Sequence, residues 1–98
     1  LGITFKENVD DVRESPAVAV VSMLSRELPG SEILVVDPMA SELPKCLSGA
    51  KNVRFSAVMP AELRDFDVVV GLVAHDDFRA LDTADFGEAT VVDTRNMF

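Results

Sequence analysis

The chain has 98 residues, of which 48% are hydrophobic and 27% are charged, a balance typical of one globular domain and not of a disordered segment. Its longest apolar run, Val68–Ala74, is far shorter than the ~20 residues that a membrane-spanning helix needs. The formal net charge of −8 repels nucleic acid phosphates and anionic membranes, so we expect neither as a partner.

The single cysteine, Cys46, excludes an internal disulfide and any zinc site built from several cysteines. A lone thiol fits a reducing compartment, and the first residues lack the basic and apolar regions of a secretory signal, so we expect a cytoplasmic protein. The sequence opens directly in a strand-like run, which leads us to expect that the native chain begins well before residue 1.

The predicted elements alternate between strands and helices. Leu1–Phe5 is a short apolar run with a β-branched centre, typical of a strand, and residues 6–14 follow it as a polar loop. Ser15 and Pro16 predict a helix start, with a hydroxyl at the N-cap and proline at the first helical position. Pro29-Gly30 ends this helix. Its predicted buried face repeats every three to four residues, through Ala17, Val20, Val21, Leu24 and Leu28.

The rest of the chain continues the same alternation. Further strands are predicted at Glu32–Asp37, Asn52–Ser56, Asp67–Leu72 and Thr90–Asp93. Short helical segments are predicted within Met39–Ala50, at Pro60–Asp65 and at Asp76–Leu81. The strand at Asp67–Leu72 has no polar alternation, which is typical of strands buried on both faces of a parallel sheet. Residues 1–98 are therefore predicted to form a single α/β domain, a sandwich with a mainly parallel sheet.

One long motif carries a family resemblance. The stretch Gly2–Ala17 reads GITFKENVDDVRESPA. It resembles the signature that opens the C-terminal domain of the UDP-glucose/GDP-mannose dehydrogenase family, and it matches nearly all of that signature. Val35–Pro38, His75 with Phe78, and Val91–Asn96 resemble later landmarks of the family and follow in the same order. The resemblance therefore covers the whole chain.

The resemblance implies a three-part enzyme of which residues 1–98 are the C-terminal UDP-sugar-binding domain. An N-terminal Rossmann domain would bind NAD, and a central helical region would carry the catalytic cysteine and form the dimer or a higher oligomer. The whole enzyme would oxidise the C6 alcohol of a UDP-sugar to a carboxylate in two hydride transfers with two NAD, for polysaccharide biosynthesis. It also implies about five strands in the order 3-2-1-4-5, in a three-layer α/β/α sandwich.

A shorter match concerns the branch within the family. Leu43–Lys45 and Leu47–Gly49 resemble the branch that converts UDP-N-acetyl-D-mannosamine to UDP-N-acetyl-D-mannosaminuronate. Gluco, N-acetylmannosamino and N-acetylglucosamino substrates differ at C2, and the residues that read C2 are expected mostly in the other domains. The branch is therefore favoured, and the sugar stays open.

Lys6 and Arg95 are the candidate cations for an anionic substrate, because each follows a predicted strand closely. Ligands of parallel sheets bind outside the carboxyl ends of the strands, and an ammonium or a guanidinium there can hold a diphosphate. The resemblance makes Phe5 and Lys6 a substrate-contacting pair and brings Arg95 to the UDP-sugar. The alternative for both cations is an ordinary solvated surface side chain.

Arg13 stands among three acidic residues, Asp10, Asp11 and Glu14. The resemblance places Arg13 on the NAD side of the closed cleft, whereas the alternative is an arginine that only pairs with these neighbours. We interpret the carboxylates as loop-capping groups that orient Arg13, and not as a metal site or an acid–base pair, because nothing else in the chain completes a metal shell.

Two residues with reactive side chains are not expected to be catalytic. Cys46 lies in LPKCL, which matches no catalytic motif, and the catalytic cysteine implied by the resemblance belongs to the central region. His75 is the only histidine, so no nucleophile–histidine relay is indicated, and a role in the fold or at an interface is favoured. The chain also lacks G-x-G-x-x-G, so it is not expected to be the main dinucleotide site.

Two other classes of function stay open. The first is a free-standing α/β ligand-binding or regulatory module, such as a receiver domain. Against it, proline follows Asp37 directly, and no lysine follows the last predicted strand. The second is a small independent enzyme, which would need a nucleophile with a base, or a metal set. Binding of UDP separates the dehydrogenase domain from both.

Overall fold

The computed structural model describes residues 1–4, 15–60, 63–95 and 97–98. Its helices are α1 (Pro16–Glu27), α2 (Lys45–Ser48) and α3 (Asp76–Arg79). Its strands are β1 (Ile33–Val36), β2 (Val53–Ser56), β3 (Val68–Gly71) and β4 (Thr90–Asp93). Two 3-10 turns lie at Leu63–Asp65 and Thr83–Phe86. Each range predicted from Ser15 onward contains one of these elements, which confirms the predicted alternation, and only the turn at Thr83–Phe86 was not anticipated.

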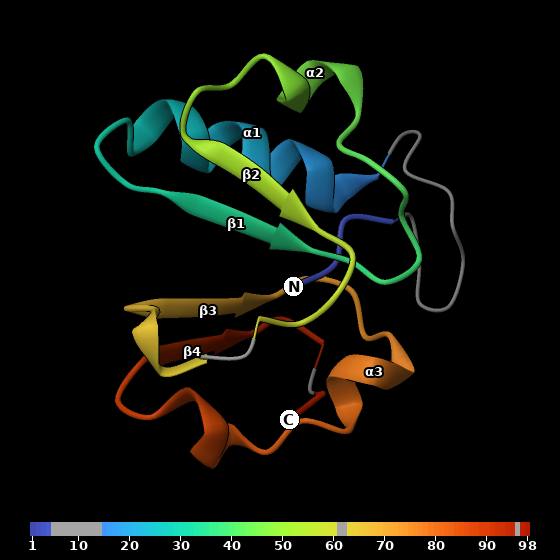
Figure 1. The fold of residues 1–98 in the computed structure, drawn as a ribbon, viewed down its shortest axis with the longest axis vertical. Coiled ribbons are helices and arrows are strands. Elements are labelled where there is room, and N and C mark those ends of the chain that lie inside the picture. The colour runs from blue at the N-terminus through green and yellow to red at the C-terminus, as the bar shows by residue number, and fades with distance from the viewer. Residues whose placement is uncertain (5–14, 61–62, 96) are drawn as a thin grey trace.

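The strands form two small parallel sheets, so the α/β class is confirmed. β1 pairs with β2 from Ile33 opposite Val53, and β3 pairs with β4 from Val68 opposite Thr90. Residues 1–4 run between the two sheets (Figure 1). There the Gly2 N–H donates to the Val36 carbonyl at 2.8 Å, and the Leu72 N–H donates to the Leu1 carbonyl at 2.9 Å.

The predicted strand at Leu1–Phe5 and a continuous five-stranded sheet are not confirmed, because residues 1–4 form no strand. The main-chain bonding to β1 stops after one hydrogen bond for a chemical reason. Pro38 has no N–H that could donate back to Gly2. The N–H groups of Ile3 and Thr4 instead donate to the side chain of Asp37.

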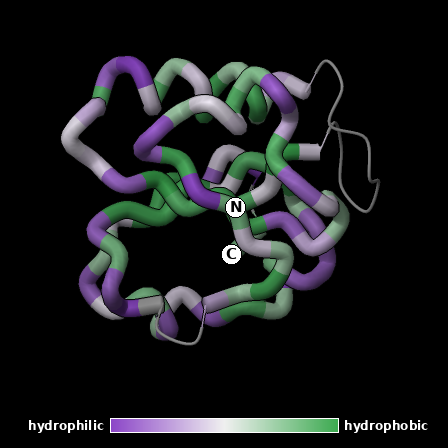
Figure 2. Tube along the Cα trace, turned by 45° about the horizontal axis from the view of Figure 1, so that its top comes forward, coloured by the Kyte–Doolittle hydropathy of each residue, from purple (hydrophilic) through white to green (hydrophobic). Residues whose placement is uncertain are grey.

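The buried hydrophobic residues form two clusters. The cluster around β1 and β2 consists of Ile3, Val18, Val21, Val35, Ala40, Leu47 and Val53. The second consists of Val36 of β1 together with Ala74, Phe78 of α3 and Met97. α1 and α2 lie on the β1–β2 side of the molecule and α3 lies beside β3 and β4 (Figure 1). Figure 2 shows hydrophobic stretches of the chain that alternate with hydrophilic ones along the tube.

Two burial predictions need correction. The buried residues of α1 are Ala17, Val18 and Val21, whereas the predicted core residues Val20 and Leu28 are 37% and 48% exposed. In β3, Val68 is 54% exposed, so this strand is not buried on both faces along its whole length. Among the described helices, none is long and apolar enough to cross a membrane.

Gly2 lies between β1 and the loop that follows β3. Its φ of +93° is a conformation that favours glycine, and a Cβ built there would lie 2.6 Å from the Cβ of Val73. A side chain at this position would push the loop after β3 away from residues 1–4. The first glycine of the signature motif is therefore explained by its close packing against Val73.

Candidate ligand-binding edge

The carboxyl ends of the parallel strands point toward one edge of the molecule (Figure 1). Asp37 follows β1 directly, His75 lies four residues after β3, and Arg95 lies two residues after β4. Residues 1–4 lead to the same edge. In parallel sheets this edge is where ligands bind, so these side chains define the candidate site.

Asp37 is the centre of this edge, and its side chain is fully buried. Oδ2 accepts hydrogen bonds from the N–H groups of Ile3 at 2.7 Å and Thr4 at 3.1 Å. Oδ1 accepts from the N–H of Met39 at 2.8 Å. A buried carboxylate is stable only when its oxygens are well bonded, and these three main-chain donors supply that bonding.

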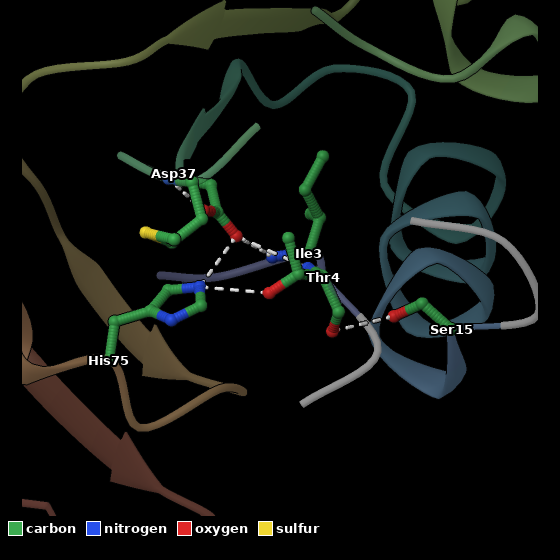
Figure 3. A network of polar contacts seen from close by, with 6 residues as sticks. Ile3, Thr4, Ser15, Asp37 and His75 are labelled. Atoms are coloured by element: carbon green, nitrogen blue, oxygen red, sulfur yellow. Dashed lines mark hydrogen bonds and ion pairs between the residues drawn. The ribbon is translucent and has the colours of Figure 1, made fainter. Parts of the chain in front are cut away.

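His75 closes the network from the other side (Figure 3). Its Nε2 lies 3.1 Å from Oδ2 of Asp37 and 2.9 Å from Oγ1 of Thr4, and its side chain is 1% exposed. The imidazole ring also packs against Phe78, with 5.5 Å between ring centroids. This burial supports the predicted role of His75 in the fold, although the sequence did not reveal its partners.

Ser15 joins the network through the main chain of Thr4. Its hydroxyl donates to the Thr4 carbonyl at 3.1 Å (Figure 3). The N-cap position of Ser15 is confirmed, but its hydroxyl makes no capping bond to α1. The two residues that flank the segment 5–14 are thus bonded to each other, and both are buried.

Arg95 is exposed at the same edge, and its role as a ligand-binding cation stays a prediction. Its Nε donates to the Leu72 carbonyl at 3.2 Å, and its main-chain N–H donates to Oδ1 of Asp93 at 3.1 Å. Asp93 also accepts from the N–H groups of Met97 and Phe98. These local bonds fix the turn that presents the guanidinium, whose single hydrogen bond to the described residues leaves other donors for a ligand.

The other predicted site residues, Phe5, Lys6 and Arg13, lie outside the described residues, and their roles stay predictions. Cys46 is exposed on α2, whereas the next residue of the same helix, Leu47, packs into the cluster around β1 and β2. In the described part of the chain, no group of histidine, cysteine, aspartate and glutamate residues could hold a metal ion.

The sequence missed the network of Thr4, Ser15, Asp37 and His75. The sequence pattern around Asp37 indicates a family landmark and argues against a receiver-type acid, but it indicates no partner for Asp37 or His75. A signal was present, because Asp37 and His75 belong to two of the landmark motifs. It did not show that the two side chains meet, since 38 residues separate them in the chain.

The comparison with protein families agrees with this geometry. The model described as "UDP-glucose/GDP-mannose dehydrogenase family, UDP binding domain" matches residues 1–98. The chain belongs to this family and forms the family's UDP-binding domain.

Curated relatives share this assignment. The chain is similar to an NDP-N-acetyl-D-galactosaminuronic acid dehydrogenase of Ralstonia solanacearum, with 42% identity over 97 residues. It is also similar to UDP-N-acetyl-D-mannosamine dehydrogenases of Yersinia pestis and Escherichia coli, with 38% and 35% identity. Each match covers 99% of this chain but 22% of the relative's length. No solved structure matches significantly.

Proposed function

We propose that residues 1–98 are the C-terminal UDP-sugar-binding domain of an NAD-dependent UDP-sugar 6-dehydrogenase. Its favoured substrate is UDP-N-acetyl-D-mannosamine, which the whole enzyme oxidises at C6 to the uronate. The observation that carries this proposal is the exposed guanidinium of Arg95 at the carboxyl edge of a chain that belongs to this family. The names of the relatives support the choice of an N-acetylated UDP-sugar.

The charge distribution supports an anionic ligand at this edge. The domain has a net charge of −8, so an anion needs cations placed at its own site. A guanidinium can donate two parallel hydrogen bonds to phosphate oxygens, and such charge-assisted bonds are among the strongest in proteins. We place the diphosphate near Arg95 and Lys6, with the substrate also contacting Phe5, and we place NAD near Arg13.

The remaining parts of the enzyme complete the proposal. An N-terminal domain binds most of the NAD, which supplies the hydride acceptor, and a central region provides the cysteine nucleophile and the contact between subunits. The role of residues 1–98 is to hold the UDP-sugar and to exclude water when the domain closes. The enzyme is proposed to work in the cytoplasm as a homodimer or larger oligomer, without nucleic acid or membrane partners.

We also propose that, in the whole enzyme, Leu1–Phe5 is the central strand of one five-stranded sheet with helices on both faces. The bonds of Leu1 support this, because its amine donates to the Val70 carbonyl and its carbonyl accepts from the Leu72 N–H. This is the pattern of one parallel bridge, with Leu1 opposite Gly71. A groove of about 570 Å³, lined by residues of β1 and β3, leaves room for the same strand to extend. A structure of the full-length enzyme would test this directly.

The function is tested by incubating the full-length enzyme with NAD and each of three UDP-sugars that differ at C2. We expect NADH formation in a ratio of two per sugar, fastest with UDP-N-acetyl-D-mannosamine. Residues 1–98 alone should give no NADH under the same conditions. Turnover by the repurified 98-residue chain, or a full-length protein that neither turns over nor binds UDP, would contradict the proposal.

A further inference from the structure

The segment 5–14 contains two of the proposed ligand-binding cations, and the network around Asp37 holds both of its flanks. Thr4 is two residues before Lys6, and Ser15 is two residues after Arg13. Among the described residues, Thr4 bonds through its N–H to Asp37, through its hydroxyl to His75, and through its carbonyl to Ser15. The entry and exit of the segment are thus bonded to each other and to the loops after β1 and β3.

The burial of these groups makes the arrangement specific. The network consists of four residues that are between 0% and 6% exposed: Thr4, Ser15, Asp37 and His75. In the described part of the chain, every buried side-chain nitrogen or oxygen has a hydrogen-bond partner. A buried polar group that moved would lose its partner with no water to replace it, so such a network favours one geometry.

We propose that Asp37 and His75 are positioning residues for ligand binding, which act through Thr4 and Ser15 on Lys6 and Arg13. This inference rests on the proposed function, because it assumes that the two cations contact UDP-sugar and NAD. Phe5 alone separates Thr4 from Lys6 in the sequence, so we expect a displacement of Thr4 to weaken ligand binding through Lys6. Small misplacements of a binding group cost much of its contribution.

The burial of these two side chains argues for an indirect role in ligand binding. Both are buried, and Nε2 of His75 points at Thr4 and Asp37, where it is already used. Their function is therefore to orient a neighbouring segment, as outer hydrogen-bond partners orient ligating groups in other sites.

The sharpest test removes single hydroxyl groups in the full-length enzyme. Thr4→Val keeps the shape but loses the bond to His75, and Ser15→Ala loses the bond between the flanks. We expect either variant to raise the Kd for UDP about tenfold in isothermal titration calorimetry. Thr4→Ser, which keeps the hydroxyl, should restore the wild-type Kd. The matched control is Ser25→Ala, which removes a hydroxyl bond to Asn52 of 2.7 Å at the C-terminal end of α1. It should lower the Tm without changing UDP affinity.

Double mutants with Lys6→Ala distinguish a positioning role of the two hydroxyl groups from a general loss of stability. In a Lys6→Ala background, Thr4→Val and Ser15→Ala should weaken UDP binding by less than twofold, because the group that they position is gone. Additive effects, or folded Thr4→Val and Ser15→Ala variants with wild-type affinity, would overturn the inference. Arg95→Ala in the same assay reports on the proposed function separately. If Arg95→Ala weakens binding and both hydroxyl variants do not, only the positioning role fails.

Discussion

Two aspartates at the carboxyl edge do similar work in different surroundings. Asp37 follows β1 and accepts from N–H groups of Ile3 and Thr4, 34 and 33 residues away. Asp93 ends β4 and accepts from N–H groups two, four and five residues ahead. Asp37 is fully buried and joins distant segments, whereas Asp93 is half-buried and its donors among the described residues all lie in the turn that follows β4. The comparison teaches that the end of the edge around Asp37 holds the fold together, whereas the end around Asp93 presents Arg95.

The largest difference between these ends should appear in stability. Asp37→Ala leaves main-chain donors and the ring of His75 without their buried acceptor, and we expect it to lower the free energy of unfolding by about 3–5 kcal/mol. Asp93→Ala affects a local turn that water can reach, and we expect a loss of about 1 kcal/mol. Urea unfolding of both variants measures the two values. Equal losses would show that the contrast between the ends is wrong.

The buried amine of Leu1, near Asp37, should also make the stability of the 98-residue chain depend on pH. Burial lowers the pKa of the Leu1 amine to about 6, and the charge of Asp37 offsets this only in part. Between about pH 6 and the ordinary amine value near 8, the unfolded chain binds more protons, so stability should rise with pH across this window. At about 1.4 kcal/mol per pKa unit the full rise is roughly 3 kcal/mol.

Acetylation of the amine is the control for this prediction. It removes the charge and leaves His75 unchanged, so the acetylated chain should lose the rise between pH 6 and 8. Urea midpoints measured at several pH values are sufficient. A rise that persists after acetylation would assign the pH dependence to another group.

The smallest effect is expected at the exposed cysteine, which lies at neither end of the edge. Cys46→Ser should change the free energy of unfolding by about 0.5 kcal/mol or less, because the thiol is exposed. In the full-length enzyme it should leave kcat unchanged. A folded Cys46→Ser enzyme with a large loss of kcat would show that the nucleophile is misassigned.

Local patterns were sufficient to predict the helices and strands. The pair Ser15 and Pro16 located the start of α1, and the unbroken valines located β3, because these signals depend on neighbouring residues only. The strand at Leu1–Phe5 is not confirmed, because the outcome at residues 1–4 depends on a distant group. Its main-chain donors bond the side chain of Asp37, which no local pattern reveals.

The site shows the same limit. The position of Arg95 after the last strand followed from the order of elements, so its exposure at the carboxyl edge was predictable. The meeting of Thr4, Asp37 and His75 was not predictable, because it requires contacts across 33 to 71 residues. Periodicity places a residue on a face of its own element, but it does not identify the side chain that it meets.

The central claim is that the carboxyl edge of this domain binds the UDP moiety. Isothermal titration of the full-length enzyme with UDP tests it most directly, with Arg95→Ala compared with Arg26→Ala, an exposed arginine in the last turn of α1. A charge-assisted bond to phosphate is worth ~1.5–3 kcal/mol, so Arg95→Ala should raise the Kd about ten- to a hundredfold. Arg26→Ala should leave the Kd within about twofold. Equal affinity of wild type and Arg95→Ala would contradict the account.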